Sequence, residues 1–388
     1  MLPPPERLEK ALAVSDYMLG AARLASDPDV VIAKMGHLLN EAGLPVDRIV
    51  SIVQLLNAES RASARYWEKG VGASHAVFGV TATTMSEFEH SPAGEANATG
   101  EWVIFKVMET PDERFSIVRT LKDAGYTHYI CAPVFMATGM FATFNFATRA
   151  EQGFSDDDFA LLRFLYPAMA ASQEILATLR VLHEVTRMYV GDEPHRRILS
   201  GDVYRGQVMH MRAAILFADM RNFTALTSSM TAEQATQLLN DYYDCVVPAV
   251  ESRGGDVLKL IADGVLAVFR TDDDETQACA NAYAAAAECL QAIDARTAEP
   301  RFRAGCGLHL GEVAYGNVGS GMRLDYTVVG RDVNFASRIA SLCGTMGEPL
   351  LVSDAFRQHL PNALPRSCGH HALKGLADPA EVFAPPIK

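Results

Sequence analysis

Hydrophobic and polar positions in the first 160 residues alternate between helix-like and strand-like periods. Apolar residues recur at helical spacing over residues 10–43, whereas residues 48–56 form a short β-prone run. Further along, two apolar runs flank Thr138-Gly139, which predicts a hairpin. The remaining predictions are an irregular stretch at 66–100, a helix at 115–124, hairpin strands at 126–135 and 140–147, and a capped helix start at 154–159. This order predicts an α/β domain over residues 1–160.

A long helical pattern follows, and it ends in a polar connector. From residue 161 to 190 the apolar positions fall near heptad spacing, which predicts either a parallel coiled coil between two copies or packing on the preceding domain. Gly191-Asp192-Glu193-Pro194 ends the pattern, and a short polar segment runs to Gly206. We therefore expect a helical linker and connector over residues 161–208, followed by a second domain over residues 209–388.

The second domain begins with two candidate metal-binding carboxylates. A buried strand is predicted at residues 213–218 and ends at Asp219. Two β-prone runs then flank Asp263-Gly264, a strong hairpin signal that places Asp263 at the turn. Carboxylates at neighbouring strand ends can hold a pair of Mg²⁺ ions, which also bind substrate phosphates. The alternative is that Asp263 only forms the turn and Asp219 only caps a helix.

Asn334 and Arg338 lie four residues apart in a helical pattern, so they share one face of the predicted helix. A planar guanidinium suits a phosphate group, and a neutral amide suits a sugar oxygen. Together with the two carboxylates, the pair favours a nucleotide-handling enzyme over a purely structural domain.

Five motifs in the second domain resemble those of the class III nucleotidyl cyclases, in order and in approximate spacing. Residues 217–224 are similar to the first metal motif of that family, and residues 259–264 to the second. Residues 316–319, 325–330 and 333–338 complete the set. The resemblance implies an α/β (α+β) fold: an antiparallel, palm-like sheet with helices on one face, preceded by the first α/β domain and the linker.

The resemblance also implies which residues bind metal and base. Asp219 and Asp263 would hold two Mg²⁺ or Mn²⁺ ions per site, with the backbone carbonyl of Met220 as a further ligand. Lys259 would donate to adenine N1, and Thr327 would contact the exocyclic amine. Because lysine offers only hydrogen-bond donors, Lys259 favours ATP over GTP.

Asn334 would orient the ribose, and Arg338 would stabilise charge at the α-phosphate. The implied phosphate contacts are the amides of Asn222, Phe223 and Thr224, together with Arg323 and Lys374. Asn222 and Ala262 stand where glycine is common in the family, which affects loop shape near the metals without removing a named role. The resemblance further implies a head-to-tail homodimer with sites at the interface.

The first domain resembles a GAF domain in its order of elements and in its hairpin. The resemblance implies a sensor for a small-molecule ligand that the sequence does not identify, lined by strands near residues 50–56 and 129–146. A GAF-like fold used only for dimerisation is the alternative.

Composition excludes some partners. The chain has 388 residues, 49% of them hydrophobic, and a formal net charge of −13, which argues against nucleic acid because that partner needs a basic surface. No apolar run approaches 18 residues, so we expect no membrane span and a cytoplasmic protein. The sequence thus predicts an adenylate cyclase that forms cyclic AMP and pyrophosphate. A guanylate or mixed-substrate cyclase and a catalytically silent nucleotide-binding module are the alternatives.

Overall fold

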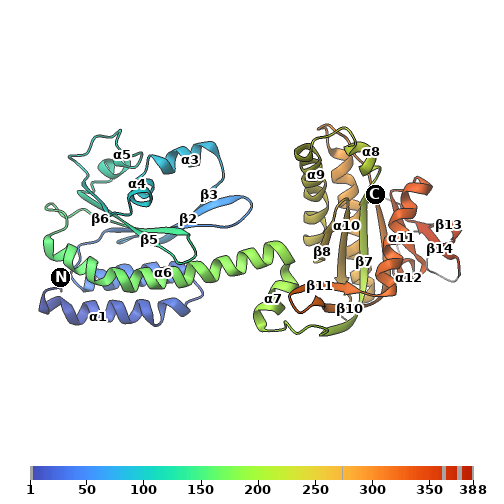
Figure 1. Cartoon of the computed structure of the whole chain (residues 1–388), viewed down its shortest axis with the longest axis horizontal. Coiled ribbons are helices and arrows are strands. Elements are labelled where there is room, and N and C mark those ends of the chain that lie inside the picture. Colours follow the sequence, from blue (N-terminus) through green and yellow to red (C-terminus); the bar gives the residue numbers. More distant parts are fainter. Residues whose placement is uncertain (1–2, 273, 361–363, 374–377, 387–388) are drawn as a thin grey trace. The chain divides into compact units, whose positions relative to one another are not determined.

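The computed structural model describes residues 3–272, 274–360, 364–373 and 378–386, which form two compact units, residues 1–188 and residues 189–388 (Figure 1). Each unit has its own sheet and its own hydrophobic core. Over the described ranges, no helix is both long enough and apolar enough to cross a membrane.

The first unit is a six-stranded antiparallel sheet with helices on both faces. Its strand order is β3-β2-β1-β6-β5-β4. The strands are β1 (Arg48–Gln54), β2 (Ser60–Glu68), β3 (Gly72–Gly79), β4 (Val103–Lys106), β5 (His128–Phe135) and β6 (Phe141–Thr148). The helices are α1 (Pro5–Leu19), η1 (Ala22–Leu24), α2 (Pro28–Glu41), α3 (Ala82–Glu89), α4 (Pro92–Thr99), α5 (Val118–Asp123) and α6 (Asp156–Val190).

Two apolar clusters fix these helices to the sheet. On one face α1, α2 and α6 pack around residues such as Met35, Trp67 and Phe146. On the other face α4 and α5 pack around Phe105 and Tyr129. The face assignment follows from strand alternation, since neighbouring residues of a strand point to opposite sides.

The predicted hairpin and long helix of the first unit are confirmed, but the irregular middle is wrong. Residues 66–100 contain the end of β2, the strand β3 and the helices α3 and α4. Strand β3 lies at the edge of the sheet and reads Gly-Ala-Ser-His-Ala-Val-Phe-Gly, with most positions exposed. Because its pairing with β2 is made by the backbone, its side chains carry little hydrophobic signal.

The second unit is built on an eight-stranded, mostly antiparallel sheet with the order β13-β14-β12-β10-β7-β9-β8, and β11 pairs with β10. The strands are β7 (Val208–Met220), β8 (Asp256–Ile261), β9 (Gly264–Arg270), β10 (Ala304–Ser320), β11 (Arg323–Val329), β12 (Leu350–Ser353), β13 (Arg366–His371) and β14 (Ala380–Ala384). The helices are α7 (Asp192–Ser200), α8 (Phe223–Thr227), α9 (Ala232–Glu251), α10 (Glu275–Ala295), α11 (Arg331–Met346) and α12 (Asp354–Arg357).

The antiparallel sheet is confirmed, but the expectation that its helices lie on one face needs correction. Helices α9 and α10 cover the face that holds Cys306 and Leu308 of β10. Helix α11 lies on the opposite face, where a Cβ at Gly307 would come within 2.4 Å of the Ala340 nitrogen and one at Gly305 within 2.7 Å of the Cys343 Cβ. The glycines thus let α11 approach the strand closely, a feature that helix periodicity alone does not reveal.

Candidate active site

The two candidate metal carboxylates lie side by side at one end of the strand pair β7–β9. Asp219 is opposite Gly264 in the antiparallel register, and the backbone N–H of Met220 donates to the carbonyl of Asp263 at 2.9 Å. Asp263 belongs to the two-residue turn between β8 and β9, because Ile261 pairs with Gly264. The hairpin read from the sequence is therefore present, and it brings Asp263 next to Asp219.

The electrostatics of this pair favour a bound cation. Partial burial, and secondarily the negative charge of Asp263, raise the pKa of Asp219 to about 6. No cation is among the causes that set this pKa, and a divalent ion would provide one. No group of three or more His, Cys, Asp or Glu side chains is placed to hold a metal anywhere in the described ranges. Two carboxylates, with the Met220 carbonyl as the expected further ligand, suit Mg²⁺, because that ion draws its remaining ligands from water and substrate phosphates.

Two loop residues beside the carboxylates adopt left-handed backbone conformations. Asn222 has a φ of 57° and Ala262 a φ of 49°. Asparagine tolerates this region better than alanine does, and glycine best of all. The local geometry thus explains why glycine suits both positions, and it identifies Ala262 as a strained residue in the turn that carries Asp263.

The candidate phosphate loop follows β7. Asn222 immediately precedes α8, so Phe223 and Thr224 form its first turn. Arg323 is exposed at the start of β11. Lys374 lies outside the described residues. Of the predicted phosphate contacts, three are therefore contiguous in the chain, and Arg323 belongs to a different strand.

Lys259 and Thr327 are the two side chains expected to contact the adenine base, and they are called the base readers below. They lie on strands that approach each other. Lys259 of β8 forms an ion pair with Asp325 of β11. Asp325 and Thr327 are two residues apart on one strand, so they point to the same face of β11. Lys259 therefore reaches the face of β11 that also carries Thr327, which is 5% exposed.

Asn334 and Arg338 lie one turn apart on α11, as their spacing predicts. Asn334 is exposed and Arg338 is half-buried. Neither side chain makes a hydrogen bond or an ion pair with another described residue. Both groups are thus available to a ligand.

Sequence reasoning missed two features of this region. Asp325, the partner of Lys259, lies within a recognised motif, but nothing in the sequence pairs it with a residue 66 positions away. A cavity of about 450 Å³ beside the phosphate loop is lined by Arg221, Arg296, Arg301 and Arg303. The Arg-Phe-Arg run at residues 301–303 was the available signal for this basic cavity.

Part of this chain is similar to known proteins. The sequence model of the family described as "Adenylate and Guanylate cyclase catalytic domain" matches residues 207–364. An adenylate cyclase of Anabaena cylindrica is 33% identical over 162 residues, which are 40% of this chain and 32% of that protein. The terminal-differentiation-specific adenylate cyclase of Dictyostelium discoideum is 31% identical over 190 residues, 47% of this chain and 9% of that protein.

The chain therefore covers about a third or less of the length of these two relatives. Among solved structures, the adenylyl cyclase CyaB from P. aeruginosa is similar, with 26% identity and a TM-score of 0.40, covering 47% of this chain and 97% of that chain.

Proposed function

We propose that the chain is an adenylate cyclase whose activity is regulated by its first unit, because the sequence model of the adenylate and guanylate cyclase catalytic domain matches residues 207–364. The observation that carries the proposal is the adjacency of Asp219 and Asp263, two carboxylates that could hold a pair of metal ions between them. The product would be 3′,5′-cyclic AMP, with pyrophosphate as the leaving group.

In the proposed reaction, the ribose 3′-oxygen of ATP attacks its own α-phosphorus. The new bond joins O3′ to that phosphorus. The bond to the oxygen that bridges to the β-phosphate breaks, pyrophosphate leaves with the electron pair, and the hydroxyl proton passes to solvent. Two Mg²⁺ or Mn²⁺ ions held by Asp219, Asp263 and the Met220 carbonyl would supply activation of the attacking oxygen and neutralise phosphate charge.

The remaining side chains position the substrate and stabilise charge. Asn334 holds the ribose so that O3′ lies in line with the α-phosphorus, and Arg338 balances the charge that develops on the α-phosphate oxygens. The amides of residues 222–224 hold the terminal phosphates, with help from Arg323 and Lys374. Since these groups act mainly by position, the reaction needs no covalent enzyme intermediate.

Base recognition rests on Lys259 and on Thr327, which lies two residues after Asp325, the ion-pair partner of Lys259. Lysine donates to the unprotonated N1 of adenine, whereas guanine presents a donor at that position. This polarity supports ATP as the substrate.

One observation favours a second candidate, a guanylate or mixed-substrate cyclase. The carboxylate of Asp325, held by Lys259, is a hydrogen-bond acceptor next to the candidate base site. Such an acceptor can take the N1–H and amino donors of guanine. Relative turnover of the two nucleotides distinguishes the candidates.

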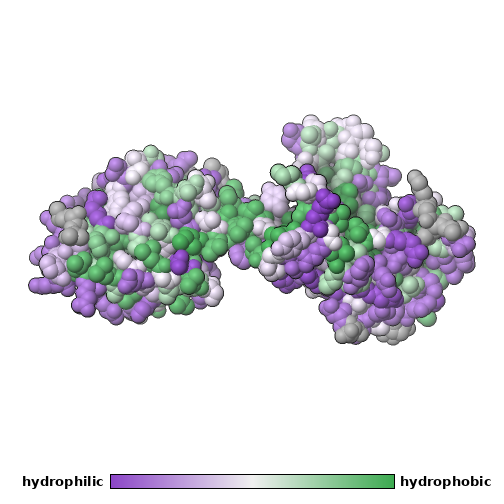
Figure 2. Space-filling model, turned by 60° about the horizontal axis from the view of Figure 1, so that its bottom comes forward, coloured by the Kyte–Doolittle hydropathy of each residue, from purple (hydrophilic) through white to green (hydrophobic). Residues whose placement is uncertain are grey.

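We propose a homodimer with two shared sites. Asp219 and Asp263 of one copy would face Lys259, Thr327, Asn334 and Arg338 of the other. Exposed apolar side chains on α6 support a helical joint between copies. Leu179 is 45% exposed and Leu182 is 48% exposed. With Ile175 they follow a three-and-four spacing, and exposed Tyr189 lies one heptad after Leu182. Figure 2 shows apolar atoms gathered along this part of α6.

We propose that a small molecule regulates the activity by binding in a cavity of the first unit, which would be the ligand site of a GAF-like sensor. It measures about 590 Å³, within the range of small-molecule sites, and lies between the sheet and the helices α3 and α4. Its lining combines aromatic side chains with cations, including Tyr66, Tyr129, Phe88, Arg48 and Arg61. These groups suit a small molecule that has both a ring and an anionic group.

The test is turnover of ATP and of GTP by the purified chain with Mg²⁺ and with Mn²⁺, with products identified by mass. Equal amounts of 3′,5′-cyclic AMP and pyrophosphate are expected, with ATP preferred by about tenfold or more. Asp219→Ala is the inactive control. If Mn²⁺-ATP is bound but gives no cyclic product, the chain is a nucleotide-binding module instead, and faster turnover of GTP makes it a guanylate cyclase.

A further inference from the structure

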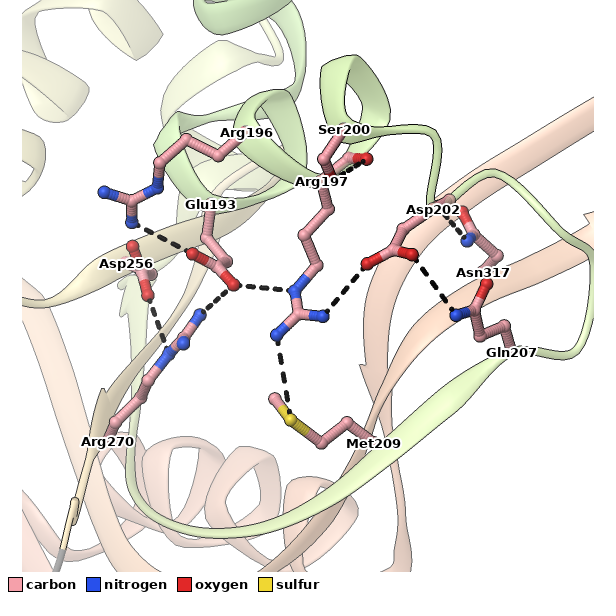
Figure 3. Close-up of polar contacts among 10 residues, drawn as sticks. All are labelled: Glu193, Arg196, Arg197, Ser200, Asp202, Gln207, Met209, Asp256, Arg270 and Asn317. Atoms are coloured by element: carbon pink, nitrogen blue, oxygen red, sulfur yellow. Dashed lines mark hydrogen bonds and ion pairs between the residues drawn. The ribbon is translucent and has the colours of Figure 1, made fainter.

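A buried carboxylate on the connector helix α7 lies at the centre of a cluster of charged residues. The side chain of Glu193 is only 8% exposed. Arg196 Nη2 donates to its Oε2 at 2.9 Å and Arg197 Nε to its Oε1 at 2.7 Å, while Arg270 Nη2 forms an ion pair with Oε1 at 2.8 Å (Figure 3). Only Arg270 lies outside α7, at the end of β9. Glu193 therefore attaches the connector to the catalytic sheet.

The first branch of the cluster reaches the hairpin β8–β9. Arg270 Nε lies 3.5 Å from the carboxylate of Asp256, the first residue of β8. Lys259, a candidate base reader, is three residues further along the same strand. The far end of the hairpin is the turn with Asp263. The position of α7 thus affects the position of β8, which carries the base reader Lys259 and ends at the turn that contains Asp263.

The second branch reaches the hairpin β10–β11. Arg197 pairs with Asp202 at 3.4 Å, and the backbone carbonyl of Asp202 accepts a hydrogen bond from the buried side chain of Asn317 at 2.8 Å. Asn317 lies opposite Tyr326 in the strand register, and Tyr326 directly precedes Thr327 in the chain. The backbone N–H of Gly206 also donates to the carbonyl of Asn317 at 2.9 Å. The same connector therefore holds the strand that carries the second base reader.

Aromatic packing joins the two branches. The Arg270 guanidinium carbon lies 5.6 Å from the centroid of the Tyr315 ring. Tyr315 in turn packs edge-on against Tyr326, with 4.8 Å between the two ring centroids. Glu193, Asp202 and Asp256 balance the charges of Arg196, Arg197 and Arg270 within this cluster. A shift of α7 would leave buried charges uncompensated unless both hairpins followed it.

We propose that Glu193 is a positioning residue for base recognition, which sets the spacing between Lys259 and Thr327 by holding their two hairpins to α7. The proposal rests on the proposed cyclase function and adds a specificity determinant to it. Glu193 touches no substrate. Its effect falls on the binding and selection of the base, whereas the metal carboxylates and Arg338 govern the chemical step. Movement of α7 would thereby change the affinity for ATP.

The test compares Glu193→Gln with the parent in the full chain. Gln keeps the shape of the side chain and removes its charge. We expect the KM for ATP to rise about tenfold, because small displacements of positioning groups have large effects, while kcat changes by less than about threefold. In the same variant, the ratio of kcat/KM for ATP to kcat/KM for GTP should fall. Glu193→Asp, which keeps the charge, should recover most of the ATP preference.

A matched control is Glu288→Gln, which removes the partner of Arg253 from an exposed ion pair of the same unit. It should leave KM and nucleotide preference unchanged. A purely structural role for Glu193 would lower the fraction of active enzyme without moving KM or the ATP-to-GTP ratio. An unchanged KM and ratio in an active Glu193→Gln protein would overturn the proposal while leaving the cyclase function intact.

A second measurement does not depend on turnover. Backbone hydrogen exchange in Glu193→Gln should become faster in residues 256–261 and 323–329 and stay the same in residues 128–148 of the first unit. If the parent makes no cyclic nucleotide, the proposed function fails, yet this exchange pattern still supports or refutes the attachment of both hairpins to α7. Unchanged exchange in either hairpin contradicts the proposal.

Discussion

Replacing Glu193 by Gln should destabilise the second unit in a way that depends on pH. Burial alone would raise the pKa of Glu193, but Arg270, Arg197 and Arg196 outweigh it and lower the pKa from 4.5 to about 2. The ionised carboxylate therefore stabilises the folded state at neutral pH. This contribution is fully present above pH 4.5 and is lost as pH falls through about 2.

The size of the effect follows from these two pKa values. The interval from 4.5 to about 2 corresponds to roughly 3 kcal/mol. Because Arg196 is largely exposed and Gln still accepts hydrogen bonds, we expect a measured loss of about 2–3 kcal/mol at pH 7.5. At pH 3 the part of this loss that comes from the ionised carboxylate should be less than half as large. The reason is that pH 3 lies well below 4.5, so most of the stabilisation from the lowered pKa is already lost.

Denaturant unfolding followed by two probes measures this loss in the full chain. The only tryptophans, Trp67 and Trp102, belong to the first unit, so their fluorescence reports that unit, while far-UV circular dichroism reports both. Glu193→Gln should shift the dichroism transition and leave the fluorescence transition in place. A variant as stable as the parent at pH 7.5, or an equal loss at pH 7.5 and pH 3, would refute the electrostatic reasoning.

Three further changes test the site. Arg338→Ala should lower kcat by roughly two to three orders of magnitude with unchanged thermal stability, because it removes a charge at the transition state rather than a core contact; rates and melting curves of the same preparation check this. Asp219→Ala and Asp263→Ala should each abolish turnover and metal-dependent nucleotide binding together, and near-normal turnover in either variant would disprove the two-metal assignment. Lys259→Glu combined with Thr327→Cys should shift preference from ATP toward GTP in competition assays, and undiminished ATP turnover by that double variant would exclude a role in reading the base.

The local elements of the second unit were predictable because their signals lie close together in the chain. Asp263-Gly264 between two β-prone runs predicted the hairpin, and the spacing of Asn334 and Arg338 predicted their shared helix face.

Long-range partners were not predictable in this way. The pairing of Lys259 with Asp325 depends on the meeting of β8 and β11, and the contact of Glu193 with Arg270 spans 77 positions. The position of α11 opposite α9 and α10 depends on glycines in β10 that admit a helix backbone, so it is set by packing and not by hydrophobic period. In the first unit, β3 went unrecognised because an exposed edge strand needs few apolar residues.

The central claim is that carboxylates of one copy and cations of another complete a single active site, and mixing two inactive variants tests it most directly. Asp219→Ala and Arg338→Ala proteins, each nearly inactive alone, should regain activity when their subunits exchange. With random exchange half of the dimers are mixed, and each has one intact site of two, so recovery should approach about a quarter of the parental rate. No recovery, under conditions where exchange of labelled subunits is shown independently, would contradict the shared site.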